Sequence, residues 1–419
     1  MFKNRRKNLV NILKQQYPEI SKGVILLFAD FENTKYKFRQ ESSFYYLTGI
    51  TEPACVLAIY FDQEGIEEIL YLPNYGGVRE KWVTTFLGPD GESAKMLGVN
   101  QIKSLGEVQK SFIFGKKFSK EKYLNLIGDL NRKINIKTTL FALIDESEDQ
   151  YFDQTRICKK LNDFFPEIKT INIILFVDEM RRIKSKHEVD LIYNAIQITS
   201  LAHESAAKII KQNRTEIEIQ AMIEAVFTKM DATRAFPSIV ATGKNTTVLH
   251  YFPQNKKLQK GDLVLIDIGS EYKYYASDLT RTYPVGGKFS QRQKEVYEIV
   301  LQAQSYVENM AKPGMFINNQ DQPEKSLQHQ AVEFLEQKGF EKYFFHGIGH
   351  YLGIDVHDVG NVKEPLMPGA VFTIEPGIYI TEENLGIRIE DDYLMTDQGA
   401  VCLSYQLPKT IEEIEALFK

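Results

Sequence analysis

Short apolar runs separated by helical patterns dominate the first part of the chain. Three of these runs, 23–28, 56–60 and 69–72, are short and rich in Ile, Leu and Val, which predicts buried strands. Residues 1–16 are basic and polar with apolar residues on one face, which predicts an amphipathic helix. Strands that alternate with helices predict an α/β domain, and we expect its last strand at 171–177.

From residue 178 the chain changes to longer helical patterns. Apolar residues recur at roughly helical spacing across 178–212 and again across 216–230, which predicts two helices. We therefore expect one domain at 1–177 and a second at 178–419. A chain of 419 residues is too long for one ordinary core, which agrees with this division.

The rest of the second domain mixes strands and helices, which predicts an α+β architecture. The run 264–269 predicts a buried strand, and 272–284 is expected to pair back as its antiparallel partner. The further expected elements are helices at 291–310 and 322–338 and strands at 370–375 and 386–394.

Composition and charge narrow the function classes. The chain is 43% hydrophobic and 26% charged with a net charge of -5, so nothing points to nucleic acid or an anionic membrane as a partner. We find no run of transmembrane length and no apolar region of a secretion signal at the N-terminus. The three cysteines are widely separated and odd in number, so we expect a reducing, cytoplasmic setting without disulfides or a thiolate zinc site.

Four carboxylates and one histidine stand in strand-like or glycine-rich segments of the second domain: Asp267, Asp278, His350, Glu375 and Glu390. Hard oxygen donors with a single imidazole favour Mn²⁺ or a similar divalent ion over a sulfur-preferring one. Two ions that share carboxylates can hold one water between them. If these side chains converge, we expect a two-metal hydrolase.

Asp267 and Asp278 show why a cation is expected. Asp267 ends an apolar strand, where an unpaired carboxylate is costly to bury. Asp278 follows eleven positions later, across the expected hairpin, so the two acids could face each other on neighbouring strands. Like charges at that distance repel unless one is protonated or a metal lies between them. The alternative is that Asp267 caps a turn before Gly269 and Asp278 is a surface acid.

Histidines gather in the segment 346–358, which holds three histidines and three glycines in thirteen residues. Glycines let the backbone approach a ligand closely, and neutral imidazoles serve as metal ligands, proton carriers or hydrogen-bond donors. A lone histidine is more often structural, but the cluster favours a functional site. His250, followed by Tyr251, adds a fourth histidine in similar surroundings.

Two further acids lie at the ends of expected strands. Glu375 precedes Pro376 and Gly377, a combination that ends a strand in a turn and leaves the carboxylate at its tip. Period-two alternation sends Arg388 and Glu390 to the same face, where the guanidinium could orient the carboxylate or contact substrate. The alternative is a half-exposed strand with a surface ion pair.

Together these motifs resemble the pita-bread metallopeptidases and, more narrowly, the Xaa-Pro aminopeptidases (aminopeptidase P). The resemblance rests on 248–251, 267–269 with 276–278, 346–358, 374–377 and 386–392, and the N-terminal segments 38–42 and 46–53 are similar to the N-terminal domain of that group. It covers nearly the whole chain. It implies an α/β, creatinase-like N-terminal domain and an α+β pita-bread catalytic domain.

The resemblance also implies a metal centre. Asp267 would chelate one metal, and Asp278 and Glu390 would bridge both. His350 and Glu375 would complete the second. We therefore expect two divalent ions per subunit, Mn²⁺ first and Zn²⁺ or Co²⁺ as alternatives, and we expect their binding to stabilise the fold.

The implied reaction is hydrolysis of the Xaa-Pro bond, which releases the first residue of a peptide that has proline second. Glu375 would shuttle a proton to the leaving nitrogen. His357 and His250 would stabilise the oxyanion and hold the substrate, and His346 and Arg388 would line the site. Because the Xaa-Pro amide has no N–H, pocket shape must select it, and we expect a hydrophobic slot for the proline ring.

The chain's only tryptophan, Trp82, lies in a segment similar to the aromatic loop that this family's N-terminal domain extends toward a neighbouring subunit. That would make catalysis depend on a homodimer or homotetramer. Val83, Thr84 and Thr85 replace a more basic stretch, however, which leaves the loop's contact partner open. The alternative is an ordinary core or surface aromatic.

Two other functions compete with this hypothesis. An Xaa-Pro dipeptidase (prolidase) shares the metal ligands, and the segment 38–42 is as reminiscent of that branch, but the short spacing from Glu375 to Glu390 favours the aminopeptidase. A non-catalytic pita-bread binding module would be expected to lack metal ligands, and a metal-free creatinase-like hydrolase is disfavoured for the same reason. A methionine aminopeptidase would not need the first domain.

Overall fold

The computed structural model describes residues 1–33, 35–145 and 150–418. The chain folds into two compact units, Met1–Met180 and Arg181–Lys419, with the division three residues beyond the expected boundary at 177. Within the described residues, no helix is both long enough and apolar enough to cross a membrane.

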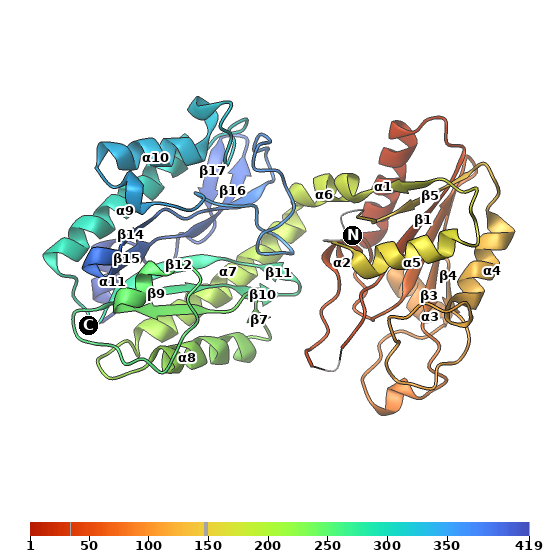
Figure 1. Ribbon diagram of the computed structural model, residues 1–419, viewed down its shortest axis with the longest axis horizontal. Helices are drawn as coiled ribbons and strands as arrows, with labels where there is room; N and C mark the ends of the chain where they lie inside the picture. The colour runs from red at the N-terminus through yellow and green to blue at the C-terminus, as the bar shows by residue number, and fades with distance from the viewer. Residues whose placement is uncertain (34, 146–149, 419) are drawn as a thin grey trace. The chain divides into compact units, whose positions relative to one another are not determined.

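The first unit is built on one mixed sheet of six strands (Figure 1). In their order across the sheet these are β4 (Gln101–Ser104), β3 (Ile66–Leu72), β2 (Val56–Phe61), β1 (Lys22–Phe28), β5 (Thr138–Ala142) and β6 (Thr170–Asn172). The central strand β1 is antiparallel to β2 and parallel to β5. Every residue of β1 after Lys22 is buried, because helices cover both faces of the sheet.

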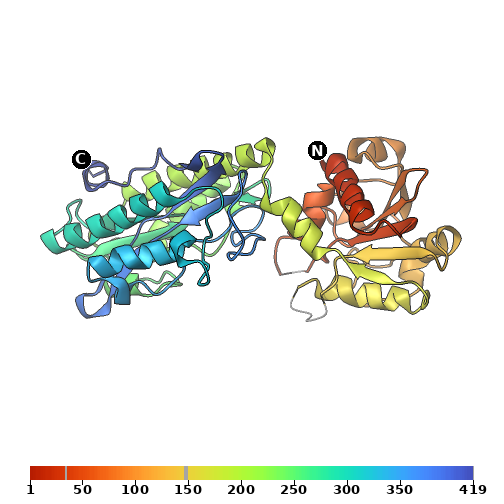
Figure 2. The ribbon, with the colours of Figure 1, turned by 90° about the horizontal axis from the view of Figure 1, so that it is seen from above.

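Helices pack on both faces of this sheet, as Figure 2 shows for α1 and α5. They are α1 (Phe2–Gln16), α2 (Ser42–Thr48), α3 (Gly91–Leu97), α4 (Leu124–Lys133) and α5 (Phe152–Asn162), with short 3-10 turns η1 (Arg79–Lys81) and η2 (Glu121–Tyr123). Leu9, Val10 and Leu13 form the buried stripe of α1, and this confirms the predicted amphipathic helix. The predicted α/β character of this unit is also confirmed.

The expectation of a strand across 171–177 is largely wrong. Only Thr170–Asn172 forms β6, and the chain then enters the helix α6 (Ile174–Arg182), which crosses the division between the units. The Asn172 side chain accepts a hydrogen bond from the Ile174 backbone N–H at 2.9 Å, an Asx turn that leads the chain from β6 into the helix. A short apolar run fits a strand and a helix equally well, and this local bond favours the helix.

The second unit consists of small antiparallel sheets with helices packed against them. Its strands are β7 (Thr233–Arg234), β8 (Ile239–Thr242), β9 (Leu263–Ile268), β10 (Ser270–Tyr272), β11 (Tyr275–Ala276), β12 (Leu279–Pro284), β13 (Val371–Ile374), β14 (Gly377–Ile380), β15 (Leu385–Arg388), β16 (Asp391–Thr396) and β17 (Gly399–Cys402). The sheet orders are β12-β9-β8, β13-β16-β17, β11-β10-β7 and the pair β14-β15. The predicted hairpin is confirmed for 279–284, since β9 pairs antiparallel with β12 and places Asp267 opposite Thr280. The earlier part of the expected partner strand is instead divided between β10 and β11, which belong to another sheet.

The helices of the second unit are α7 (Lys186–Ala207), α8 (Glu216–Lys229), α9 (Gln291–Met310), α10 (Leu327–Gln337) and α11 (Ile411–Ala416), with 3-10 turns η3 (Gly243–Thr247), η4 (Pro323–Lys325), η5 (Glu341–Tyr343) and η6 (Thr381–Glu383). Helix α7 packs on β10, β11 and β12, and α8 packs beside it on β7 and β8 (Figure 1). Helix α9 packs on α10 and against β13, β14, β15 and β17.

Three predicted elements in this unit need correction. The expected helix 178–212 is two helices, because Ser185 and Glu188 form a capping box that starts α7 anew. The expected helix 322–338 begins only at Leu327, where the Ser326 side chain caps it. The expected strand 386–394 is broken after Arg388, and its halves β15 and β16 belong to different sheets.

Candidate metal centre and active-site cleft

A cleft of about 640 Å³ in the second unit brings together nearly all of the candidate residues. Its polar lining includes Asp267, Asp278, His350, Glu375 and Glu390 together with His250, His346, His357 and Arg388. These residues come from segments up to 140 positions apart, so the fold rather than the local sequence assembles them. The rest of the lining is largely apolar, with Phe236, Pro237, Leu249 and Val356 among its members.

The β9–β12 hairpin supplies the first two acids. Asp267 lies in β9, and its Oδ2 accepts a hydrogen bond of 2.5 Å from the Arg388 guanidinium. Asp278 lies directly before β12, where its backbone N–H donates to the Asp392 carboxylate at 3.1 Å. The Oδ1 atoms of Asp267 and Asp278 are both buried without a hydrogen-bond partner. The structure therefore rejects the alternative of a turn cap and a surface acid.

Glu390 is held beside this hairpin by Thr280, which lies opposite Asp267 in β12. The backbones of Thr280 and Glu390 form an antiparallel bridge, and the Thr280 hydroxyl donates to the Glu390 carboxylate at 2.6 Å. After Arg388, the last residue of β15, the chain bridges to Thr280 instead of continuing the pairing with β14. The expected strand 386–394 is therefore broken at this point. The Glu390 side chain lines the cleft together with Arg388.

His350 and Glu375 approach from the segments around β13. The backbone N–H of Glu375 donates to Ile348 at 2.9 Å, and that of Thr373 donates to His350 at 2.9 Å, so the two segments lie side by side. His350 uses Nδ1 to bond the Tyr351 carbonyl at 3.0 Å. Its Nε2 then lies 3.4 Å from an Asp278 oxygen and 3.6 Å from a Glu375 oxygen.

This donor set fits divalent cations. Asp278, His350 and Glu390 each offer an atom within 4.8 Å of the others, and the unpartnered oxygens of Asp267 and Asp278 lie buried beside them. Burying a carboxylate oxygen without a hydrogen-bond partner costs free energy unless a cation binds it. Carboxylate oxygens with one imidazole are donors that Mn²⁺ and similar ions accept.

The pKa directions agree with this fit. Burial and repulsion from neighbouring acids raise the pKa of Asp278 and Glu390 well above the ordinary carboxyl range. Burial also raises the pKa of Glu375 to about 8. For His350, burial and the neighbouring His357 lower the pKa to about 4, so the imidazole is neutral and free to act as a ligand. Without cations, these acids keep their protons to avoid mutual repulsion.

Arg388, Tyr379 and His346 form a chain of hydrogen bonds along one wall of the cleft. Arg388 donates to the Tyr379 hydroxyl at 2.7 Å, and the His346 Nε2 lies 3.0 Å from that hydroxyl. His346 also approaches Glu375, with Nδ1 at 3.8 Å from a carboxylate oxygen. Arg388 reaches Glu390 only through Thr280, to which its Nε donates at 3.2 Å, so it orients Asp267 directly and Glu390 indirectly.

His357 and His250 lie on the cleft wall outside the acid cluster. His357 stacks on His350 with ring centroids 4.0 Å apart. Burial lowers the pKa of His357, which favours the neutral imidazole. His250 is exposed at the mouth of the cleft. Both are positioned to contact a bound molecule rather than to complete the acid cluster.

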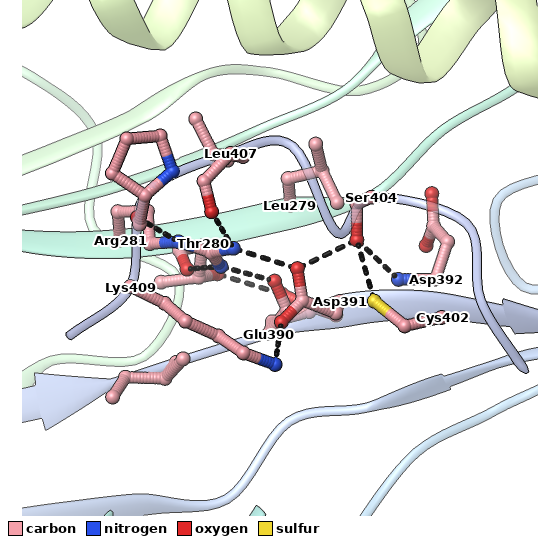
Figure 3. A network of polar contacts seen from close by, with 12 residues as sticks. Leu279, Thr280, Arg281, Glu390, Asp391, Asp392, Cys402, Ser404, Leu407 and Lys409 are labelled. Carbon is pink, nitrogen blue, oxygen red and sulfur yellow. Dashed lines mark hydrogen bonds and ion pairs between the residues drawn. The ribbon is translucent and has the colours of Figure 1, made fainter. Parts of the chain in front are cut away.

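A buried ionic network lies directly behind Glu390 (Figure 3). Arg281 donates to the carbonyls of Thr280 and Glu390 at 2.9 and 2.7 Å. It also forms an ion pair of 2.6 Å with Asp391, and both side chains are fully buried. Asp391 is shared with Lys409 at 3.1 Å. The backbone that carries Glu390 is thus fixed by charged hydrogen bonds, which are stronger than neutral ones.

Two family comparisons cover both units. Residues 190–397 match metallopeptidase family M24, and residues 2–121 match the aminopeptidase P N-terminal domain. The chain is similar to the Xaa-Pro aminopeptidase of Haemophilus influenzae, with 34% identity over 99% of this chain and 96% of that protein. This chain belongs to metallopeptidase family M24.

Two further similarities also extend over nearly the whole chain. The structure is similar to that of a putative aminopeptidase P from Bacillus anthracis, with a TM-score of 0.85, 32% identity and coverage of 99% and 97% of the two chains. The human Xaa-Pro dipeptidase is 27% identical over 99% of this chain and 92% of its own length. The expected fold, a creatinase-like α/β domain followed by a pita-bread M24 domain, is confirmed.

One expected site residue lies outside this cleft. Trp82 belongs to the first unit, where its side chain is 67% exposed and stacks on Phe112 with ring centroids 4.9 Å apart. It is therefore not a core aromatic. Its predicted role at a neighbouring subunit stays a prediction.

The sequence did not single out several residues that shape this M24 site. Thr280 lies two positions after Asp278, so period-two alternation could have placed both on one face of β12. Tyr379 bridges His346 and Arg388, but no pattern in the sequence marks it. Asp391 and Asp392 stood out only as parts of a motif, without the supporting roles that the structure gives them.

Proposed function

We propose that this chain is a metal-dependent Xaa-Pro aminopeptidase, which hydrolyses the Xaa-Pro bond and releases the first residue of a peptide. The observation that carries the proposal is the convergence of four carboxylates and one neutral histidine in one cleft of an M24 chain. Full-length similarity to the Xaa-Pro aminopeptidase of Haemophilus influenzae supports the substrate class.

The acids and His350 would hold two divalent ions, for which Mn²⁺ is our first choice and Zn²⁺ or Co²⁺ the alternatives. Asp267 would serve one ion, Asp278 and Glu390 would serve both, and His350 with Glu375 would serve the other. Bound ions would polarise the scissile carbonyl and lower the pKa of a water between them. Arg388 would hold Asp267 in its liganding orientation through their direct hydrogen bond.

Glu375 would move the proton of the reaction. It would take a proton as the water oxygen attacks the scissile carbonyl carbon, and give it to the proline nitrogen as the carbon–nitrogen bond breaks. Without metal, burial raises the pKa of this carboxyl to about 8. Bound cations would lower that pKa, so the carboxylate would be charged and able to accept the proton of the water. His346, 3.8 Å away, would help to orient it.

The walls of the cleft would bind the substrate. His357 would stabilise the negative charge that develops on the carbonyl oxygen, and His250 would hold the peptide at the mouth. The proline ring has no N–H to offer at the scissile bond, so shape must select it. Phe236, Pro237 and Leu249 supply apolar surface for that purpose.

The first domain, residues 1–177, would provide oligomer contacts and control substrate access. The exposed Trp82 would face a neighbouring subunit of a homodimer or homotetramer and contribute to its substrate site. A cytoplasmic location is proposed as well, because Cys55, Cys158 and Cys402 are free thiols.

A peptide panel tests the proposed function. Purified protein with added Mn²⁺ would be given Xaa-Pro-Yaa peptides and the matching Xaa-Pro dipeptides, and the products would be identified by mass spectrometry. Release of free Xaa from the longer peptides supports the aminopeptidase. Turnover of dipeptides alone would instead assign a dipeptidase, the activity for which the human relative is named. Full activity in protein stripped of metal would exclude the metal-dependent reaction.

A further inference from the structure

Glu216 is a buried carboxylate with four hydrogen-bond donors around it, and it lies outside the metal centre. It is the first residue of α8 and is 0% exposed. One oxygen accepts from the Thr242 backbone N–H at 2.9 Å and from Asn245 at 3.1 Å. The other accepts from the Tyr251 hydroxyl at 2.8 Å and from the Gln254 backbone N–H at 3.0 Å.

These four donors lie directly before or within one loop, residues 243–254, which we call the cleft loop. Thr242 lies at the end of β8 just before the loop, and Gln254 ends it, so one carboxylate ties both ends together. Thr246 adds a further tie near the start, because its hydroxyl accepts from the Gly386 N–H at 2.8 Å.

The middle of the cleft loop depends on Tyr251. Across 249–253 in the described structure, the hydrogen bonds run only through the Tyr251 hydroxyl, which accepts from Asn245 at 2.8 Å and donates to Glu216. Burial and the Glu216 carboxylate raise the pKa of Tyr251 to about 12, so the phenol keeps the proton that it donates. The carboxylate and the phenol therefore fix the loop between its two ends.

This loop forms one wall of the active-site cleft. Leu249, His250, Tyr251 and Phe252 all line it, and His250 carries a proposed substrate contact. We propose that Glu216 is a positioning residue for the peptidase reaction, which holds the cleft loop so that His250 meets the bound peptide. The inference rests on the proposed function, since it needs a peptide in the cleft.

A Glu216→Gln variant tests this directly because it keeps the side chain's size. One carboxylate oxygen becomes an NH₂ group, which in either orientation of the amide faces a backbone N–H donor, that of Thr242 or that of Gln254, and cannot accept from it. Glu218→Gln is the matched control. Glu218 is exposed in the same helical turn and pairs with Arg214 and Thr215, so it loses the same charge without contact to the loop.

The first measurement is hydrogen exchange of the Mn²⁺-loaded proteins. Glu216→Gln is expected to speed exchange in 243–254 and to leave the amides around His350 and Glu375 and the metal content unchanged. Tyr251→Phe, which keeps the ring and removes the hydroxyl, should speed exchange in the same segment. Glu218→Gln should match the unmodified protein. Unchanged exchange of 243–254 in Glu216→Gln would overturn the proposal.

The second measurement is a double-mutant cycle on kcat/KM for an Xaa-Pro-Yaa peptide. Glu216→Gln should lower kcat/KM by about 10-fold or more, in line with a misplaced substrate contact. In a His250→Ala background the same change should cost less than about 3-fold, because the residue that it positions is gone. An equal loss in both backgrounds would overturn the proposal. If the unmodified protein releases nothing from these peptides, the proposed function fails, and the exchange result still decides the role of Glu216 in the loop.

Discussion

Asp278 is the most crowded acid of the centre. It is buried, one oxygen has no hydrogen-bond partner, and Glu390, Asp267, Asp392 and Glu375 all repel its charge. A side chain in these surroundings is stable only with a proton or a cation. Glu375 differs because His346 and His350 also lie near it and its pKa, at about 8, is within reach of neutral pH.

These surroundings predict different outcomes for two isosteric variants. Glu375→Gln should keep bound Mn²⁺ and lose turnover by about 100-fold or more, because an amide cannot carry the proton. Asp278→Asn should lose bound metal as well as turnover. Metal content by atomic emission and kcat on an Xaa-Pro-Yaa peptide check both. Unchanged rates in either variant, or equal metal content in Asp278→Asn, would contradict these roles.

Asp391 predicts a stability effect behind the centre. In Asp391→Asn the buried Arg281 and the partly exposed Lys409 lose the negative charge that they share, and breaking the buried pair of Arg281 and Asp391 costs about 3–5 kcal/mol. Because Arg281 also holds the Glu390 carbonyl, affinity for Mn²⁺ should fall by about 10- to 100-fold.

Calorimetric unfolding and Mn²⁺ titration of Asp391→Asn would measure these two effects. Asp397→Asn, at an exposed position six residues along the chain, is the control and should change neither. If the Asp391→Asn protein keeps the Tm and the Mn²⁺ affinity of the unmodified protein, the network behind Glu390 stabilises neither the fold nor the metal centre.

At the scale of elements, β9 could be predicted because its apolar run is local. A strand that changes its partner could not be predicted in this way. The end of β15 depends on Thr280, which is 110 positions from its partner Glu390. A sequence window cannot show a change of strand partner of this kind. The restart of α7 was within reach, because Ser185 and Glu188 have the spacing of a capping box.

The close contact of the His350 segment with β13 makes Gly349 a sensitive position. A Cβ at Gly349 would lie 2.0 Å from the Thr373 carbonyl oxygen, so Gly349→Ala must push the segment away from β13. Overpacking of this kind costs about 1–3 kcal/mol. We expect a lower Tm and weaker Mn²⁺ binding, since His350 moves with the backbone.

Gly347→Ala is the matched control for this prediction. A Cβ there would meet nothing closer than 3.9 Å, so the Tm and Mn²⁺ affinity should be unchanged. Thermal unfolding with and without Mn²⁺ compares the two variants. If Gly349→Ala binds Mn²⁺ as tightly as Gly347→Ala does, the strand contact does not position His350.

At the scale of the whole molecule, the acids predict a link between metal, pH and stability. The raised pKa values of Asp278, Glu390 and Glu375 mean that the folded protein without metal keeps protons that the unfolded chain releases. The contribution of these three acids to stability should therefore be greatest below the ordinary carboxyl pKa and fall as the pH rises through that range toward about 8, the pKa of Glu375.

Bound cations remove this dependence, because they replace the protons. The difference in Tm between Mn²⁺-loaded and stripped protein should thus widen from pH 5 to pH 8. In free energy of unfolding, the widening amounts to roughly 1.4 kcal/mol for each unit of pKa shift. Comparing loaded with stripped protein at each pH cancels the titration of groups elsewhere. A gap in Tm that stays constant with pH would mean that the acids are not the metal ligands.

The sequence predicted the two-unit organisation and, through its motifs, the residues that meet in the cleft. Their positions at strand ends marked Asp267 and Glu375 as candidates, and the resemblance to the Xaa-Pro aminopeptidases completed the set. The supporting residues were harder to predict. Tyr379, Glu216 and Arg281 act through contacts with distant segments, and nothing in their own neighbourhoods distinguishes them from ordinary buried residues.

The proposed function requires that five side chains of the second unit enclose a pair of divalent ions. Anomalous diffraction at the manganese absorption edge, from crystals grown with Mn²⁺, tests it most directly. We expect two peaks about 3.5–4 Å apart, with Asp278 and Glu390 bonded to both. The absence of peaks among these side chains, or ions bound elsewhere in the cleft, would contradict it.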